Sequence, residues 1–171
     1  MQRVMVIGCS GAGKSTLTRQ LAKEWDLPVI HLDRAYWQPY WVETPKEEWR
    51  AKVGELVLAE RWIMDGNYSG SMDIRLPHTD LIIWLDFSRW LCLWRVFKRT
   101  LRFWGRVRPD MTDGCAERFD FPFFHYVFFF PEIHRPRLLK RLADYPDSQI
   151  LRFSSPRQLN QWQTEGYKLK N

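Results

Sequence analysis

The chain has 171 residues, a length typical of one domain that buries a sizeable core. A hydrophobic fraction of 45% and an aromatic fraction of 16% exclude a disordered protein, and no apolar run reaches the roughly 18 residues that a membrane-spanning helix needs. The net charge of +6 favours an anionic partner, such as a polyphosphate ligand or a nucleic acid.

The first predicted elements are a strand at residues 3–7, a glycine-rich turn and a helix over residues 16–24. The turn, residues 8–15, matches the phosphate-binding pattern G-x-x-x-x-G-K-[ST] at every fixed position. Its glycines let N–H groups turn toward an anion, Lys14 supplies charge for the β- and γ-phosphates, and Ser15 supplies an oxygen for Mg²⁺. The motif predicts a nucleoside triphosphate site. The predicted binding residues are Gly8, Ser10, Gly11, Ala12, Gly13, Lys14, Ser15 and Thr16.

A second strand is predicted at residues 27–33 and ends on Asp33. Ligands of open α/β sheets gather at the carboxyl ends of strands, so Asp33 is a candidate for binding an acceptor hydroxyl or a Mg²⁺-bound water. A helix N-cap or a surface turn explains this carboxylate equally well. Thr44, Pro45 and Glu47 predict a capped helix that runs to about residue 60. We interpret residues 33–60 as an insert that covers the acceptor, or as a hydrophobic flap on the sheet.

Two further strands, at residues 61–67 and 79–86, also carry a carboxylate where they end. Asp65 and Asp86 are therefore alternative ligands for Mg²⁺, bound directly or through water. Asp65 is favoured, because the turn that Asp65 and Gly66 allow brings the backbone close to a nucleotide. A fifth strand is predicted at residues 148–153.

A basic helix is predicted at residues 88–104, followed by an aperiodic segment at residues 105–120. Residues 89–118 hold eight basic and three acidic side chains, which leaves five of the six net positive charges in this part of the chain. Four arginines share one predicted helix face, which suggests phosphate contacts. They are Arg95, Arg99, Arg102 and Arg106. Residues 105–120 are expected to form a lid, and Arg106 and Arg108 are candidates for an arginine finger.

Together these features resemble the P-loop kinases of the nucleoside monophosphate kinase type. More narrowly, they are similar to the bacterial DNA topology modulation proteins, over nearly the whole chain. The stretches that carry this likeness are His31-Leu32-Asp33, residues 62–68, residues 108–111, Gly114-Cys115 and Glu117-Arg118. The resemblance implies an α/β fold with a five-stranded parallel sheet, flanked by helices, in the spatial order second, third, first, fourth, fifth strand.

The resemblance also implies the ligands and the roles of residues. ATP and Mg²⁺ are the expected cofactors, and the acceptor is a small molecule or a nucleotide. Ser15 and Asp65 are expected to hold Mg²⁺, and Arg95 and Arg99 to contact phosphate or base. The catalytic candidates are Lys14, Asp33, Asp65, Arg99 and Arg108.

One departure from the adenylate kinase pattern concerns the acceptor. That signature continues Asp-Gly-Phe-Pro-Arg, whereas Asn67 and Tyr68 follow Asp65-Gly66 here. An acceptor-binding arginine is missing at that place, although Arg75 lies nearby, and this puts a nucleoside monophosphate acceptor in doubt.

We favour a kinase over the alternative, a nucleotide-dependent protein that contacts DNA through residues 89–118. No nucleic-acid recognition motif occurs in the sequence, and a kinase needs the same basic residues. We expect residues 1–171 to form a single cytoplasmic domain without a signal peptide or membrane partner.

Overall fold

The central element is a parallel sheet of five strands. The structure is a computed structural model that describes residues 2–143 and 149–167. The strands are β1 (Arg3–Gly8), β2 (Val29–His31), β5 (Trp62–Asp65), β6 (Leu81–Leu85) and β7 (Gln149–Phe153), in the spatial order β2-β5-β1-β6-β7. Counted along the chain within this sheet, the order is second, third, first, fourth, fifth, which confirms the prediction. Residue 148, the predicted start of the last strand, lies outside the described residues.

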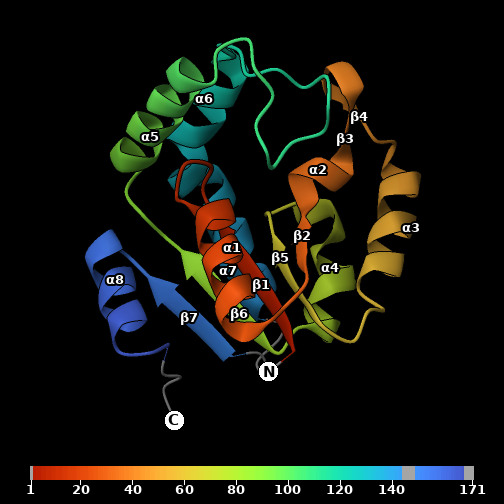
Figure 1. Ribbon diagram of the computed structural model, residues 1–171, viewed down its shortest axis with the longest axis vertical. Helices are drawn as coiled ribbons and strands as arrows, with labels where there is room; N and C mark the ends of the chain where they lie inside the picture. The colour runs from red at the N-terminus through yellow and green to blue at the C-terminus, as the bar shows by residue number, and fades with distance from the viewer. Residues whose placement is uncertain (1, 144–148, 168–171) are drawn as a thin grey trace.

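Helices cover both faces of the sheet, because alternate side chains of the buried strands point to opposite sides (Figure 1). Val4 and Val6 pack with α1 (Lys14–Trp25), α5 (Arg89–Arg102), α6 (Phe121–Phe129) and α8 (Pro156–Thr164). Met5 and Ile7 pack on the other face with α3 (Lys46–Leu56), α4 (Met72–Arg75) and α7 (Arg135–Ala143). The result is a three-layer α/β domain whose core lies on both sides of β1.

The segment after β2 differs from its prediction at two points. The strand stops at His31, and Asp33 lies in the short helix α2 (Leu32–Tyr36) rather than at a strand end. The predicted capping box is also absent, because the Thr44 hydroxyl donates to the Tyr36 carbonyl and Pro45 takes the N-cap position of α3. Between them lie β3 (Trp37–Gln38), η1 (Pro39–Trp41) and β4 (Val42–Glu43), with β3 and β4 paired antiparallel.

Short helical turns complete the described chain. η2 (Ser69–Ser71) and η3 (Leu76–His78) flank α4, and the π-helical turn η4 (Phe130–His134) joins α6 to α7. Residues 105–120 form no helix or strand and take part in two isolated bridges, Glu117 with Trp104 and Val107 with Ala116. Among the described residues, no helix is both long and apolar enough to cross a membrane.

Candidate active site

The glycine-rich turn between β1 and α1 has the backbone that phosphate binding requires. Gly8, Gly11 and Gly13 have φ values of 141°, 83° and 100°, which side chains other than glycine rarely adopt. A Cβ at Gly8 would lie 2.3 Å from the Leu85 carbonyl oxygen, and one at Gly11 would lie 2.3 Å from that of Cys92. The turn is therefore packed directly against β6 and α5. No side chain caps the start of α1 and no acid lies in its first turn, so its N–H groups suit an anion.

The side chains of the turn contact its own backbone and α5. Lys14 Nζ donates to the Cys9 carbonyl at 3.2 Å, and Arg95 Nη1 donates to the Ala12 carbonyl at 3.1 Å. Ser15 is half-buried at the start of α1, whereas the side chain of Thr16 is exposed. Arg95 thus holds the turn in place through a neutral carbonyl. Lys14 likewise donates to a carbonyl, and among the described residues no carboxylate forms an ion pair with it.

Asp65, the favoured Mg²⁺ candidate, lies at the end of β5 and is 5% exposed. His31 is its register partner on β2, and His31 Nδ1 lies 2.7 Å from Asp65 Oδ1. Burial alone would lower the pKa of His31, but the hydrogen bond and the charge of Asp65, with a further contribution from the charge of Asp110, raise it. Sequence analysis had not singled out this pairing.

Asp33 faces the cavity from α2, although its place in the fold was predicted wrongly. Its Oδ1 accepts a hydrogen bond of 2.7 Å from the Tyr68 hydroxyl. Burial and the charge of Asp33 raise the pKa of Tyr68, so this phenol stays protonated and orients the carboxylate.

Asp86, the alternative Mg²⁺ candidate, is neutralised by two arginines. Arg135 Nη2 lies 2.8 Å from Asp86 Oδ2, and Arg152 Nε donates to the same oxygen at 2.9 Å. Neither Asp86 nor Asp65 lines the cavity described below. The choice between Asp65 and Asp86 as a Mg²⁺ ligand stays a prediction.

The residues that depart from the adenylate kinase signature have structural partners. Asn67 accepts from the Gly8 amide at 2.9 Å and donates to the Gly8 carbonyl at 2.8 Å. Arg75 is fully buried and donates at 3.1 Å to the carbonyls of both Gly66 and Tyr68. Burial lowers the pKa of Arg75 to about 9. Arg75 supports the loop after β5 and does not line the cavity.

The predicted arginine stripe of α5 divides into two parts. Arg95 and Arg99 are half-buried and contact the interior, whereas Arg102 and Arg106 are exposed. The stripe is consequently not a continuous basic surface. This weakens the DNA-binding alternative, which requires one.

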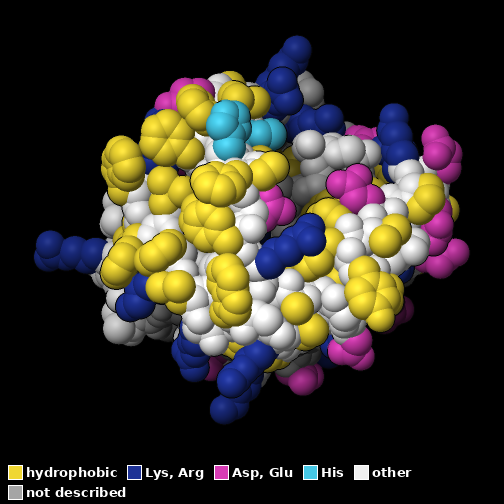
Figure 2. Space-filling model, turned by 90° about the horizontal axis from the view of Figure 1, so that it is seen from above, with side chains coloured by type: hydrophobic (Ala, Val, Ile, Leu, Met, Phe, Trp, Pro, Cys, Tyr) yellow, Lys and Arg dark blue, Asp and Glu magenta, His cyan; other side chains and the backbone are white. Residues whose placement is uncertain are grey.

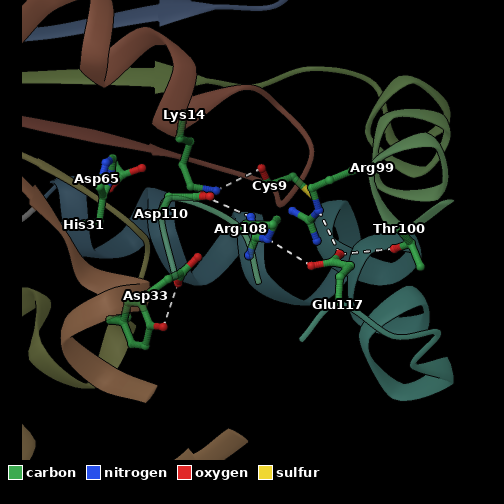
Figure 3. A network of polar contacts seen from close by, with 11 residues as sticks. Cys9, Lys14, His31, Asp33, Asp65, Arg99, Thr100, Arg108, Asp110 and Glu117 are labelled. Atoms are coloured by element: carbon green, nitrogen blue, oxygen red, sulfur yellow. Dashed lines mark hydrogen bonds and ion pairs between the residues drawn. The ribbon is translucent and has the colours of Figure 1, made fainter. Parts of the chain in front are cut away.

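The lid segment brings Arg108 next to Arg99 (Figure 3). Arg108 Nη1 donates to Asp110 Oδ2 at 3.0 Å, and Arg108 Nε lies 2.9 Å from Glu117 Oε2. Burial alone would raise the pKa of Asp110, but the charge of Arg108, with smaller contributions from backbone N–H groups and Ser15, holds it below its usual value. Asp110 thus lies close to Ser15 of the P-loop.

The lid segment and the insert meet over the site. Trp41 Nε1 donates to the Ala116 carbonyl at 3.0 Å, and the Thr112 hydroxyl donates to the Arg34 carbonyl at 2.8 Å. Two segments that the sequence analysis treated separately therefore close one cavity from above. Figure 2 shows this upper face, where acidic and basic side chains lie close to extensive hydrophobic surface.

The cavity has a volume of about 640 Å³, which suits a nucleotide part or a small metabolite. Lys14 and Ser10 line it at the P-loop, and Asp33 lines it from the insert. Its other charged lining residues are Glu43, Arg99, Arg108, Glu117, Arg118, Asp120, Arg137 and Arg141. Four of the five predicted catalytic residues share this cavity; Asp65 is the exception.

Comparisons with known proteins identify the fold. No family model and no curated protein sequence matches the chain. Among solved structures, a shikimate kinase from Acinetobacter baumannii in complex with shikimate matches with a TM-score of 0.61 and 16% identity, over 99% of this chain and 96% of that one. The chain has the same α/β fold as this kinase.

Two further structures agree. A sugar kinase from Janibacter sp. matches with a TM-score of 0.52 and 17% identity, over 96% of this chain and 93% of that one. A gluconokinase from Sinorhizobium meliloti matches with a TM-score of 0.50 and 15% identity, over 91% and 84%. At these identities the likeness establishes the architecture.

Within this fold, sequence reasoning missed residues whose partners are distant in the chain. Glu117 was noted only as an acid and Tyr68 only as part of a motif, yet both contact predicted catalytic residues. Their occurrence in the family-like stretches, residues 62–68 and Glu117-Arg118, was the available signal. Arg137 and Arg141, one helical turn apart on α7, lie outside these stretches.

Proposed function

We propose that the protein is an ATP-dependent kinase that phosphorylates a small-molecule acceptor. The observation that carries this proposal is the shared cavity, in which the P-loop Lys14 and the carboxylate of Asp33 line the same space. The small-molecule kinase fold supports it. A cytoplasmic location and the narrower likeness to topology modulation proteins remain predictions.

The residues present fit both expected cofactors. The uncapped start of α1 and the positive-φ glycines suit phosphate, and Ser15 and Asp65 offer the oxygen ligands that Mg²⁺ prefers. No group of three or more His, Cys, Asp or Glu side chains in the described chain suits a metal by itself, which agrees with an ion held largely by phosphates and water. When bound, ATP would supply the phosphoryl group and Mg²⁺ would offset its charge.

The side chains around the cavity have different roles in the proposed reaction. Lys14, Arg99 and Arg108 stabilise negative charge that develops on the transferred group. Asp33, oriented by Tyr68, accepts a hydrogen bond from the acceptor hydroxyl and takes its proton. The lid segment and the insert meet over the cavity, and exclusion of water by these segments would limit hydrolysis.

The acceptor side of the cavity favours a negatively charged molecule. Arg137 and Arg141 line it from α7, and neither forms a hydrogen bond or an ion pair with the described residues. Two such guanidinium groups suit a carboxylate or a phosphate on the acceptor. We infer an anionic hydroxyl compound as the acceptor class.

Transfer of labelled γ-phosphate from ATP with Mg²⁺ tests this function, across hydroxy acids, sugar phosphates, sugars and nucleoside monophosphates. We expect labelled product with an anionic acceptor, and a loss of activity of at least about a hundredfold in Lys14→Ala, because one positioned charge at the transferring group contributes several kcal/mol. Lys46→Ala, an exposed lysine at the start of α3, is the matched control. Tight ATP binding without transfer to any acceptor would contradict the proposal.

A further inference from the structure

Glu117 is a buried carboxylate to which sequence analysis assigned no role. It is 5% exposed and contacts three side chains at once. Its Oε1 accepts hydrogen bonds from Arg99 Nε at 3.0 Å and from the Thr100 hydroxyl at 3.2 Å, while its Oε2 lies 2.9 Å from Arg108 Nε. One carboxylate therefore joins an arginine of α5 to an arginine of the lid segment (Figure 3).

The backbone fixes Glu117 at the base of the lid segment. Its amide donates to the Arg106 carbonyl at 2.9 Å, and its carbonyl accepts from the Gly105 amide at 3.0 Å. These bonds bring the two ends of the lid segment together beside the end of α5. The side chain is consequently directed at Arg99 whenever the lid segment keeps this fold.

Arg99 and Arg108 need an anion between them because they repel each other. Burial and the positive charge of Arg108 lower the pKa of Arg99, and the charge of Glu117 opposes that effect. Without Glu117, solvent-directed rotamers would separate the two guanidinium groups. With it, both line the same cavity as Lys14.

The contacts leave donors for a further anion. Arg99 uses only Nε on Glu117, and its Nη atoms donate to no described residue. The Nε of Arg108 is close to Glu117, but its N–H is not aligned for a hydrogen bond. Such loose geometry is common in sites that tighten around a ligand.

We propose that Glu117 is a positioning residue that holds Arg99 and Arg108 together beside Lys14 to receive the γ-phosphate. This inference rests on the proposed function for the identity of the ligand. It makes a specific prediction, because ADP lacks the γ-phosphate. Glu117 should strengthen the binding of ATP and leave the binding of ADP unchanged.

This prediction is tested in the full-length protein by titration calorimetry in the presence of Mg²⁺, with ADP and with a non-hydrolysable ATP analogue as ligands. Glu117→Gln keeps the shape of the side chain and removes its charge. We expect about tenfold weaker binding of the ATP analogue, since hydrogen bonds to charged groups carry this much energy, and unchanged binding of ADP. Asp113→Asn, an exposed carboxylate in the same lid segment, should bind both ligands as the wild type does.

A double-mutant cycle separates positioning from general support of the fold. If Glu117 acts through Arg99 and Arg108, Glu117→Gln should cost nothing further for the ATP analogue in a background that carries Arg99→Ala and Arg108→Ala. Equal losses for ADP and the ATP analogue, or an undiminished loss in that background, would overturn the inference.

Thr100→Val provides a milder variant should Glu117→Gln fail to fold, because it removes one hydrogen bond to Oε1 and no charge. A several-fold loss for the ATP analogue alone is then expected, and no loss would overturn the inference. Neither result depends on the acceptor. A protein that transfers no phosphate but shows the Glu117 effect would contradict only the proposed function.

Discussion

Asn67 explains at the scale of one residue why the chain departs from the adenylate kinase signature. Its amide group pairs with both the N–H and the C=O of Gly8, as a neighbouring strand would. The β1 backbone therefore keeps its hydrogen bonds at the point where it leaves the sheet for the P-loop. The phenylalanine that the signature has at this position would leave these two polar groups of a buried glycine without side-chain partners.

Replacing this side chain should affect both folding and nucleotide binding. We expect Asn67→Ala to lower the free energy of unfolding by about 2 kcal/mol, since buried donors and acceptors without partners cost roughly 1–3 kcal/mol. ATP should also bind more weakly, because the P-loop loses an anchor. Urea unfolding and calorimetry measure the two effects. Asn160→Ala, an exposed asparagine on α8, should lower neither quantity, and the same absence of loss in Asn67→Ala would contradict this account.

At the scale of elements, the local sequence pattern correctly predicted those strands and helices whose formation depends mainly on neighbouring residues. The strands that form the core and the strand–turn–helix unit around Lys14 agree with prediction, because hydrophobic runs and glycine spacing specify them directly. Asp33 was misplaced, because the helix α2 begins at Leu32, whose buried side chain packs with Trp49 and Met64 far along the chain. Thr44 failed as a helix cap for the same reason, since its hydroxyl is engaged by Tyr36 across the β3–β4 hairpin. Tertiary contacts of this kind leave no local signature.

The packing of α5 on the P-loop gives a prediction at this scale. Gly11→Ala places a methyl group 2.3 Å from the Cys92 carbonyl oxygen at a φ of 83°, so α5 and the turn must separate. We expect a loss of about 2 kcal/mol or more in the free energy of unfolding and weaker ATP binding. Gly54→Ala is the matched control, because a Cβ there meets nothing within 4 Å inside α3. It should stabilise the protein by roughly 0.5–1 kcal/mol, and thermal unfolding of both variants checks the contrast.

Ion pairs join distant parts of the whole molecule. Arg50 binds Asp73 at 2.7 Å and so links α3 to α4, Arg89 pairs with Glu132 between α5 and η4, and Arg152 pairs with Asp86 between β7 and the end of β6. The guanidinium of Arg50 lowers the pKa of Asp73, and that of Arg89 lowers the pKa of Glu132. Acid should therefore loosen contacts between elements before it alters any single element.

The sign of the pH dependence follows from these lowered pKa values. A carboxyl whose pKa is lower in the folded state stabilises the protein above its unfolded value, about 4, and loses that contribution as the pH falls through the folded value. Asp73→Asn should lower the free energy of unfolding at pH 7 by less than about 1 kcal/mol, because the pair is partly exposed. Urea unfolding at pH 7 and at pH 2.5 measures this difference, which should shrink toward zero in acid and in 1 M salt. A difference that persists at pH 2.5 would show that packing, and not the charge of Asp73, holds α3 against α4.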